Sequence, residues 1–176
     1  MLFRSVPYSH ADYPKLRVIA RILSSKFLLP TIREQNGAYG AGAKVGLDGI
    51  FSFFSYRDPN SVRTLETFDD SFNWISSNVG KIINEQVLFE AKLGVLQQLD
   101  SPVSAMDRGM ENFKFGVTHD MFIRHRSSVL ETTLNDVKTV AEKYLQDDKK
   151  TVVGRSVIGP KNEELSSKNW MIVNQE

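Results

Sequence analysis

Apolar residues recur at helical spacing across residues 14–29, the first strongly patterned stretch of the chain. Pro14 suits the first turn of a helix, where its missing N–H is not needed. Pro30 is expected to end this helix, because proline inside a helix removes a backbone hydrogen bond and crowds the preceding turn. A helix that kinks at Pro30 and continues through Arg33 is the alternative.

The spacing changes to alternation after Asn36-Gly37, which is a turn signal. Residues 38–47 are predicted to form one strand and residues 50–57 a second, joined by a turn at Asp48-Gly49. The second strand is rich in aromatic residues, which favour strands. In the first strand, alternation assigns Tyr39, Ala41, Ala43 and Val45 to one face and Gly40, Gly42 and Lys44 to the other.

Downstream of the hairpin the pattern is mostly helical. Asp58-Pro59-Asn60 is expected to open a helix to about Ser77, and Asn84 to cap another helix to about Leu99. Shorter helices are predicted near residues 104–115, 119–130 and 133–146, followed by a strand at 150–158 and an apolar docking segment at 170–173.

This order of elements indicates an α+β fold. A hairpin and a distant late strand can share one antiparallel sheet, with the helices packed on one face. The chain has 176 residues, which is long enough to bury a real core. We therefore expect residues 1–176 to form a single domain.

Composition excludes several classes of function. The net charge is +1, so charge gives no argument for a nucleic-acid or membrane-surface partner. Cysteine is absent, which excludes disulfides, thiolate metal sites and a cysteine nucleophile. No apolar run approaches the roughly 20 residues that a membrane-spanning helix needs. The opening residues lack the features of a targeting peptide, so we expect any targeting information to lie outside this chain.

Candidate metal ligands are few. His119 and His125 are six residues apart, whereas two helical ligands of one zinc ion need a spacing of three or four. We therefore expect no metal site in this chain and place both histidines on the surface. The glycines at residues 37–42 lack the spacing of a nucleotide-binding loop and precede a strand instead of a helix. No serine lies in a nucleophile elbow.

Arg33 and Tyr39, with Gly40 and Gly42 behind them, are the strongest candidates for chemistry. One interpretation is structural, with the arginine in a salt bridge at a helix end and the tyrosine as an ordinary strand residue. The other starts from the glycines, because each glycine inside a strand costs roughly 0.5–1 kcal/mol relative to alanine. Such glycines are tolerated where another backbone or a ligand approaches closely. An extended peptide would be such a ligand.

The same stretch carries a family resemblance. The sequence IREQNGAYGAGAKVGLDGIFSFFSYRDPN resembles the C-terminal half of the pitrilysin-type (inverzincin) zinc metallopeptidases, and its AYGAG and SYRDPN parts favour the presequence protease branch. Three further segments share the resemblance, which extends from about Val6 to Pro160: VPYSHADYPKLRVIARILSSKFL, EAKLGVLQQLDSPVSAMDRGMENFKFG and VIGPKN.

The resemblance implies an enzyme of two halves that enclose a chamber, with zinc held in the N-terminal half by an H-x-x-E-H motif that this chain lacks. Arg33 and Tyr39 would reach across to hold the substrate and stabilise the tetrahedral intermediate, with Gly40 and Gly42 in the same substrate-binding edge. The implied substrates are targeting presequences and other unstructured peptides, the implied partner is the N-terminal half, and the implied location is the mitochondrial matrix. On its own, the chain is expected to be inactive.

The family resemblance also raises two structural expectations. Only residues 1–5 precede the VPY segment, so we expect a truncated first strand and a sheet that lacks one neighbour. Such a sheet would favour self-association of the isolated chain. Two other functions stay open: a non-catalytic assembly domain, like the inactive core subunits of respiratory complexes with this fold, and a free-standing peptide-binding module.

Overall fold

The computed structural model describes residues 1–145, 152–160, 163–166, 170, 171 and 173. Its strands are β1 (Leu2–Arg4), β2 (Gly40–Val45), β3 (Ile50–Tyr56) and β4 (Val152–Gly154). Its helices are α1 (Tyr13–Leu23), η1 (Ser24–Gln35), α2 (Ser61–Asn78), α3 (Glu85–Leu99), α4 (Met110–Phe115), α5 (His119–Glu131), α6 (Leu134–Tyr144) and α7 (Glu163–Ser166).

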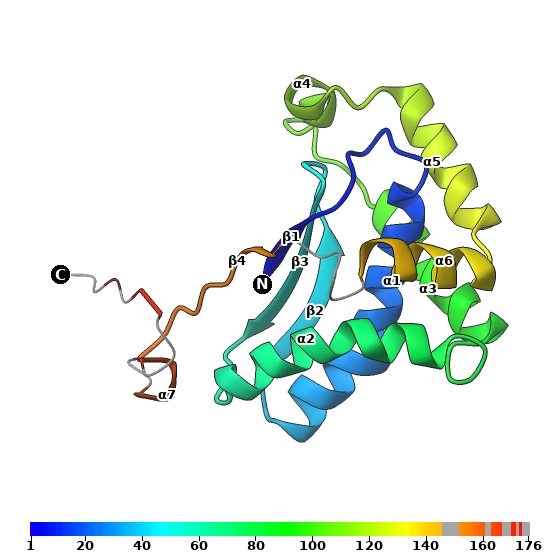
Figure 1. The fold of residues 1–176 in the computed structure, drawn as a ribbon. Helices are drawn as coiled ribbons and strands as arrows, with labels where there is room; N and C mark the ends of the chain where they lie inside the picture. The colour runs from blue at the N-terminus through cyan, green and yellow to red at the C-terminus, as the bar shows by residue number, and fades with distance from the viewer. Residues whose placement is uncertain (146–151, 161–162, 167–169, 172, 174–176) are drawn as a thin grey trace.

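The four strands form one antiparallel sheet in the order β2-β3-β1-β4. Helices α1, α2, α3, α5 and α6 lie together on one side of this sheet (Figure 1). The predicted α+β fold, with helices packed on one face of an antiparallel sheet, is therefore confirmed.

The first strand is short but occupies an inner position. Leu2–Arg4 pairs with β3 on one side and with β4 on the other. The sheet thus has a strand at the position where we expected a missing neighbour. Its outer strands are β2 and β4.

The core is built from aromatic residues that alternate inward along the strands. Phe3 and Phe51 stack with ring centroids 4.9 Å apart, and Phe53 meets the edge of Phe72 from α2 at 5.6 Å. All four rings are buried. Each contributes about 1.5–3 kcal/mol by leaving water, so this cluster fixes which face of the hairpin points inward. Phe54, between two inward residues, faces outward.

The first helix does not end at Pro30. It changes at Ser24 from an α-helix to a π-helix that continues through Pro30 to Gln35. In an α-helix, the proline ring collides with the carbonyl four residues back. The wider π-helix pairs residues five apart and moves that carbonyl away from the ring. The expected stop at Pro30 is therefore wrong, and the alternative, continuation through Arg33, is what the structure shows.

The later elements follow the predicted order. The Asn84 side chain accepts a hydrogen bond from the Val87 N–H, as expected for the cap of α3. The late strand is limited to Val152–Gly154 in the described residues, and residues 150 and 151 of the prediction lie outside them. In the predicted docking segment, Trp170 packs against the core, Met171 is exposed, and residue 172 lies outside the described residues. Among the described helices, none is long and apolar enough to cross a membrane.

Candidate functional site

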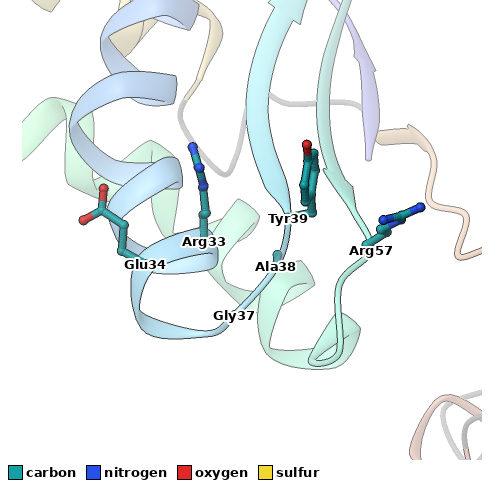
Figure 2. A pocket seen from close by; sticks show the side chains of 6 residues that line it. All are labelled: Arg33, Glu34, Gly37, Ala38, Tyr39 and Arg57. Atoms are coloured by element: carbon teal, nitrogen blue, oxygen red, sulfur yellow. The ribbon is translucent and has the colours of Figure 1, made fainter.

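An open hollow of about 650 Å³ lies where the end of η1, the following turn and the ends of β2 and β3 meet (Figure 2). Both polar residues singled out from the sequence line it. The complete lining is Arg33, Glu34, Gly37, Ala38, Tyr39 and Arg57. The site is therefore formed by the connection between η1 and β2, together with Arg57 at the end of the hairpin that lies opposite its turn.

The turn between η1 and β2 is held by backbone hydrogen bonds. The Gly37 N–H donates to the Arg33 carbonyl at 3.1 Å, and the Ala38 N–H donates to the Ile32 carbonyl at 3.1 Å. Gly37 has φ +79°, a conformation that side chains other than glycine rarely adopt. The Asn60 amide donates to the Asn36 carbonyl at 2.9 Å, which ties the turn to the start of α2. These contacts set the separation between Arg33 and Tyr39.

Tyr39 lies just before β2 and is 68% exposed. Its N–H donates to the carbonyls of Tyr56 at 3.1 Å and Arg57 at 3.4 Å. Its ring meets the Tyr56 ring edge-on at 5.9 Å. The strand begins at Gly40, so Tyr39 lies just outside the strand that was predicted to include it, and its ring lies beside that of Tyr56. Its hydroxyl has no hydrogen-bond partner among the described residues and is free to meet a ligand.

Arg33 is exposed at the last turn of η1. Figure 2 shows it extending on the same side as the Tyr39 hydroxyl, while Glu34 points away from both. In the described part of the chain, Arg33 makes no ion pair, so the salt bridge of the structural interpretation is not seen there. A guanidinium in this position offers five N–H donors to whatever occupies the hollow.

Gly40 and Gly42 differ in what surrounds them. A Cβ on Gly42 would lie 3.0 Å from the Phe54 ring and 3.2 Å from the Ser24 hydroxyl, so packing within the fold already favours glycine there. A Cβ on Gly40 would meet nothing within 4 Å. Packing among the described residues therefore gives no steric reason for glycine at position 40.

Four lining residues were not selected from the sequence, Glu34, Gly37, Ala38 and Arg57, and of these Arg57 contacts the Tyr39 ring. Its guanidinium carbon lies 5.8 Å from the Tyr39 ring centroid and 5.5 Å from that of Tyr56. Its φ of +48° makes it the one non-glycine residue with positive φ among those described. The register of the hairpin could have identified Arg57 from the sequence. Gly40 pairs with Tyr56, so the next residue along each strand places Arg57 opposite Tyr39.

The two helical histidines do not form a metal site. His125 is 3% exposed, so its predicted surface position is wrong. Its ring stacks on Tyr8 at 5.0 Å and meets Tyr13 at 5.4 Å. Burial, with a smaller effect from Arg17, lowers the pKa of His125 to about 4. Within the described residues, no group of three or more histidine, cysteine, aspartate or glutamate side chains could hold a metal ion.

The sequence comparisons agree with one another. The family described as "PreP C-terminal domain" matches residues 7–158. The chain is 47% identical to "Presequence protease, mitochondrial" of Drosophila melanogaster over 97% of its length, and 43% identical to the Xenopus laevis protein of that name over 96%. It spans only 16% of the length of each of these relatives.

A solved structure supports the fold. The chain superimposes on a Bordetella pertussis protein described as a zinc protease with a TM-score of 0.68 and 20% sequence identity. The match covers 90% of this chain and 92% of the other. At this identity the likeness concerns the fold alone, with helices on one face of an antiparallel sheet.

Proposed function

The chain belongs to the family of presequence protease C-terminal domains, and from this we propose that it is the substrate-contacting domain of a larger zinc metalloendopeptidase. Its substrates would be targeting presequences and other unstructured peptides. Arg33 and Tyr39 would hold the peptide at the bond that is cut. The observation that carries the proposal is their placement on one open hollow, with the tyrosine hydroxyl and the guanidinium both unpartnered among the described residues.

Tyr39 would act on the charge that develops during hydrolysis. Attack on a peptide carbonyl turns its oxygen into an oxyanion, and a phenol within hydrogen-bond reach stabilises that charge. Arg33 would donate to nearby peptide carbonyls or to a carboxylate through its planar guanidinium. Gly40, where the fold leaves open space, would let the peptide backbone come close to β2. Together these groups would bind and orient the peptide and stabilise the oxyanion.

Zinc would come from outside this chain. The described residues do not fit a zinc site, because they contain no suitable cluster of ligands. We propose that the ligands and the general base lie in the N-terminal half, which is also the partner that closes the chamber over the hollow. The chain alone would then be inactive. Its relatives are named mitochondrial, so we propose the mitochondrial matrix as the location.

The test uses the full-length enzyme and an unstructured peptide. Tyr39→Phe should lower kcat by about 10²–10³-fold with little change in KM, because the hydroxyl matters mainly in the transition state. Arg33→Ala should raise KM by about tenfold, as expected for a lost charge-assisted hydrogen bond. Chelation should abolish hydrolysis, and added zinc should restore it. Normal kcat/KM in both folded variants would return Arg33 and Tyr39 to the structural interpretation, whereas a full-length protein without any hydrolytic activity would favour the non-catalytic assembly domain.

A further inference from the structure

Arg57 has no acidic partner although it stands at the edge of the site. Within residues 1–145 and 152–160 it makes no ion pair. Its guanidinium is held instead by two tyrosines, at 5.8 Å from the Tyr39 ring centroid and 5.5 Å from that of Tyr56. Arg126 and Arg155 differ from it, because they pair with the carboxylates of Asp100 and Asp69. Aromatic rings therefore hold the Arg57 guanidinium in place, while its N–H groups make no ion pair with a carboxylate of the described residues.

The contacts of Arg57 leave its donors available. Cation–π contacts engage the face of the ring and the positive charge, but they do not use the N–H groups at the edge of the guanidinium. Those groups form a planar fork that matches a carboxylate, often through two parallel hydrogen bonds. The positive φ of Arg57 is a conformation that bulky residues rarely adopt and that tends to occur at functional sites. The backbone thus holds the side chain beside the hollow at some cost.

The position of Arg57 relative to Tyr39 limits what it can contact. In Figure 2, Arg33 and Arg57 lie on either side of Tyr39, and Glu34 lies beyond Arg33. An extended peptide advances about 3.3 Å per residue. If the cut bond lies at Tyr39, a peptide crossing the hollow brings a group that is one to a few residues away from that bond to Arg57.

We propose that Arg57 recognises a carboxylate of the peptide substrate, on the side of Tyr39 away from Arg33. The carboxylate belongs to an acidic side chain or to the C-terminus of the peptide. Arg57 is thus a specificity residue that, among the proposed unstructured peptides, favours those that present a carboxylate on this side of the cut bond. This inference rests on the proposed function, because it takes Tyr39 as the marker of the cut bond.

The experiment measures kcat/KM of the full-length enzyme on matched peptides. One series carries Glu or its neutral isostere Gln at each position near the cut bond, and the other ends in a free or an amidated C-terminus. For wild type, one position or the free terminus should raise kcat/KM by about tenfold, the effect of one charge-assisted hydrogen bond. The series that responds identifies the source of the carboxylate. Arg57→Gln should remove this preference, so that the variant cuts the charged and the neutral peptide of each pair with equal kcat/KM.

Two further variants distinguish recognition of the carboxylate by Arg57 from a general effect of positive charge on this face. Arg57→Glu should reverse the preference, so that Lys replaces Glu as the favoured residue at the responding position. Lys44→Gln is the matched control, because Lys44 lies on the same outer face of the sheet, 5.9 Å from the Phe54 ring centroid, but does not line the hollow. It should leave the preference intact. If Lys44→Gln reduces the preference for the charged peptide as much as Arg57→Gln does, the preference comes from the overall positive charge of this face, and the proposal is overturned.

The remaining outcomes are also decisive. If Arg57→Gln lowers kcat equally on acidic and neutral peptides, Arg57 only positions Tyr39, and carboxylate recognition is rejected. If Tyr39→Phe lowers kcat but the Arg57 variants show the same preference between charged and neutral peptides as wild type, this inference fails while the proposed function stands. If Tyr39→Phe and Arg33→Ala are fully active, the proposed function itself fails.

Discussion

The two ends of β2 serve opposite purposes. At the Val45 end, the Tyr13 hydroxyl donates to the Val45 carbonyl at 3.3 Å, and the Ser24 hydroxyl accepts from the Ala43 N–H at 2.8 Å. These side chains occupy the backbone groups of an edge strand that would otherwise pair with another chain. At the Gly40 end, Tyr39 leaves its hydroxyl unpartnered among the described residues.

Two tyrosines illustrate the difference. Tyr13 is 1% exposed, and burial raises its pKa to about 12, so its hydroxyl remains a hydrogen-bond donor at any physiological pH. Tyr39 is mostly exposed and beside two arginines that lack carboxylate partners in the described part of the chain. The same residue type stabilises the sheet at one end and faces a ligand at the other. Substitutions at the two ends should therefore separate stability from activity.

The largest effect is expected from the two tyrosine hydroxyls. Tyr39→Phe should lower kcat of the full-length enzyme by about 10²–10³-fold and leave the unfolding temperature unchanged. Tyr13→Phe should do the reverse, with a loss of about 1 kcal/mol in stability and unchanged kcat. Steady-state kinetics and thermal unfolding on both variants measure this. If both lose activity in proportion to stability, the contrast between the two ends disappears.

The second prediction concerns pH and the closed end of β2, where His125 packs against Tyr13. The folded pKa of His125 is about 4, below the unfolded value of 6.5. Between these values the unfolded state binds more protons, so stability should fall as pH falls from about 6.5 to 4, by up to about 3 kcal/mol. Below pH 4 this contribution is fully lost.

Chemical denaturation at a series of pH values tests this. His125→Phe keeps an aromatic ring beside Tyr8 and should flatten the curve between pH 6.5 and 4. The carboxylate of Asp136, whose pKa of about 2 results from Lys15 and Thr133 opposing the effect of burial, should still reduce stability at lower pH. An unchanged slope in His125→Phe would contradict the assignment.

The third prediction opens the closed edge. Ser24→Ala removes the acceptor of the Ala43 N–H and should cost about 1–3 kcal/mol, because a partly buried donor is left without a partner. It should also promote concentration-dependent association through the freed edge. Light scattering on the variant and on wild type measures this. A variant as stable and as monomeric as wild type would show that the hydroxyl does not protect the edge.

The smallest effect should come from the two glycines. Gly42→Ala should lower stability, because its Cβ would press on Phe54 and Ser24. Gly40→Ala has open space and should be neutral or stabilising by about 0.5 kcal/mol, since alanine loses less backbone entropy on folding. In the full-length enzyme, however, Gly40→Ala should raise KM, because the methyl group stands where the peptide approaches. An unchanged KM would remove Gly40 from the site.

Much of the fold was predictable because it depends on local patterns. The hairpin was placed to within about two residues, since alternation and a turn signal specify it directly. The π-helix was not, because pairing over five residues has no simple sequence signature. The burial of His125 depends on Tyr8 and Tyr13, which are distant in sequence and cannot be read from the spacing of its own helix.

The candidate site was predictable where residues are close in sequence. Arg33 and Tyr39 were selected together because a short turn joins them. Arg57 was missed because its contact with Tyr39 depends on the register across the hairpin, which shifts with each residue in the turn. The difference between the surroundings of Gly40 and Gly42 could not be predicted, because it depends on where the Phe54 and Ser24 side chains lie, and a strand pattern does not specify that.

The π-helix makes the length of the segment before Arg33 as important as its composition. Each of its turns holds more residues than the 3.6 of an α-helix, so the direction in which a side chain leaves the axis depends on how many residues precede it. Deleting one residue between Ser24 and Arg33 would favour α-helical winding and rotate the guanidinium away from Tyr39, although every residue of the hollow would still be present. Sequences of this family should therefore tolerate substitution between these positions more readily than insertion or deletion.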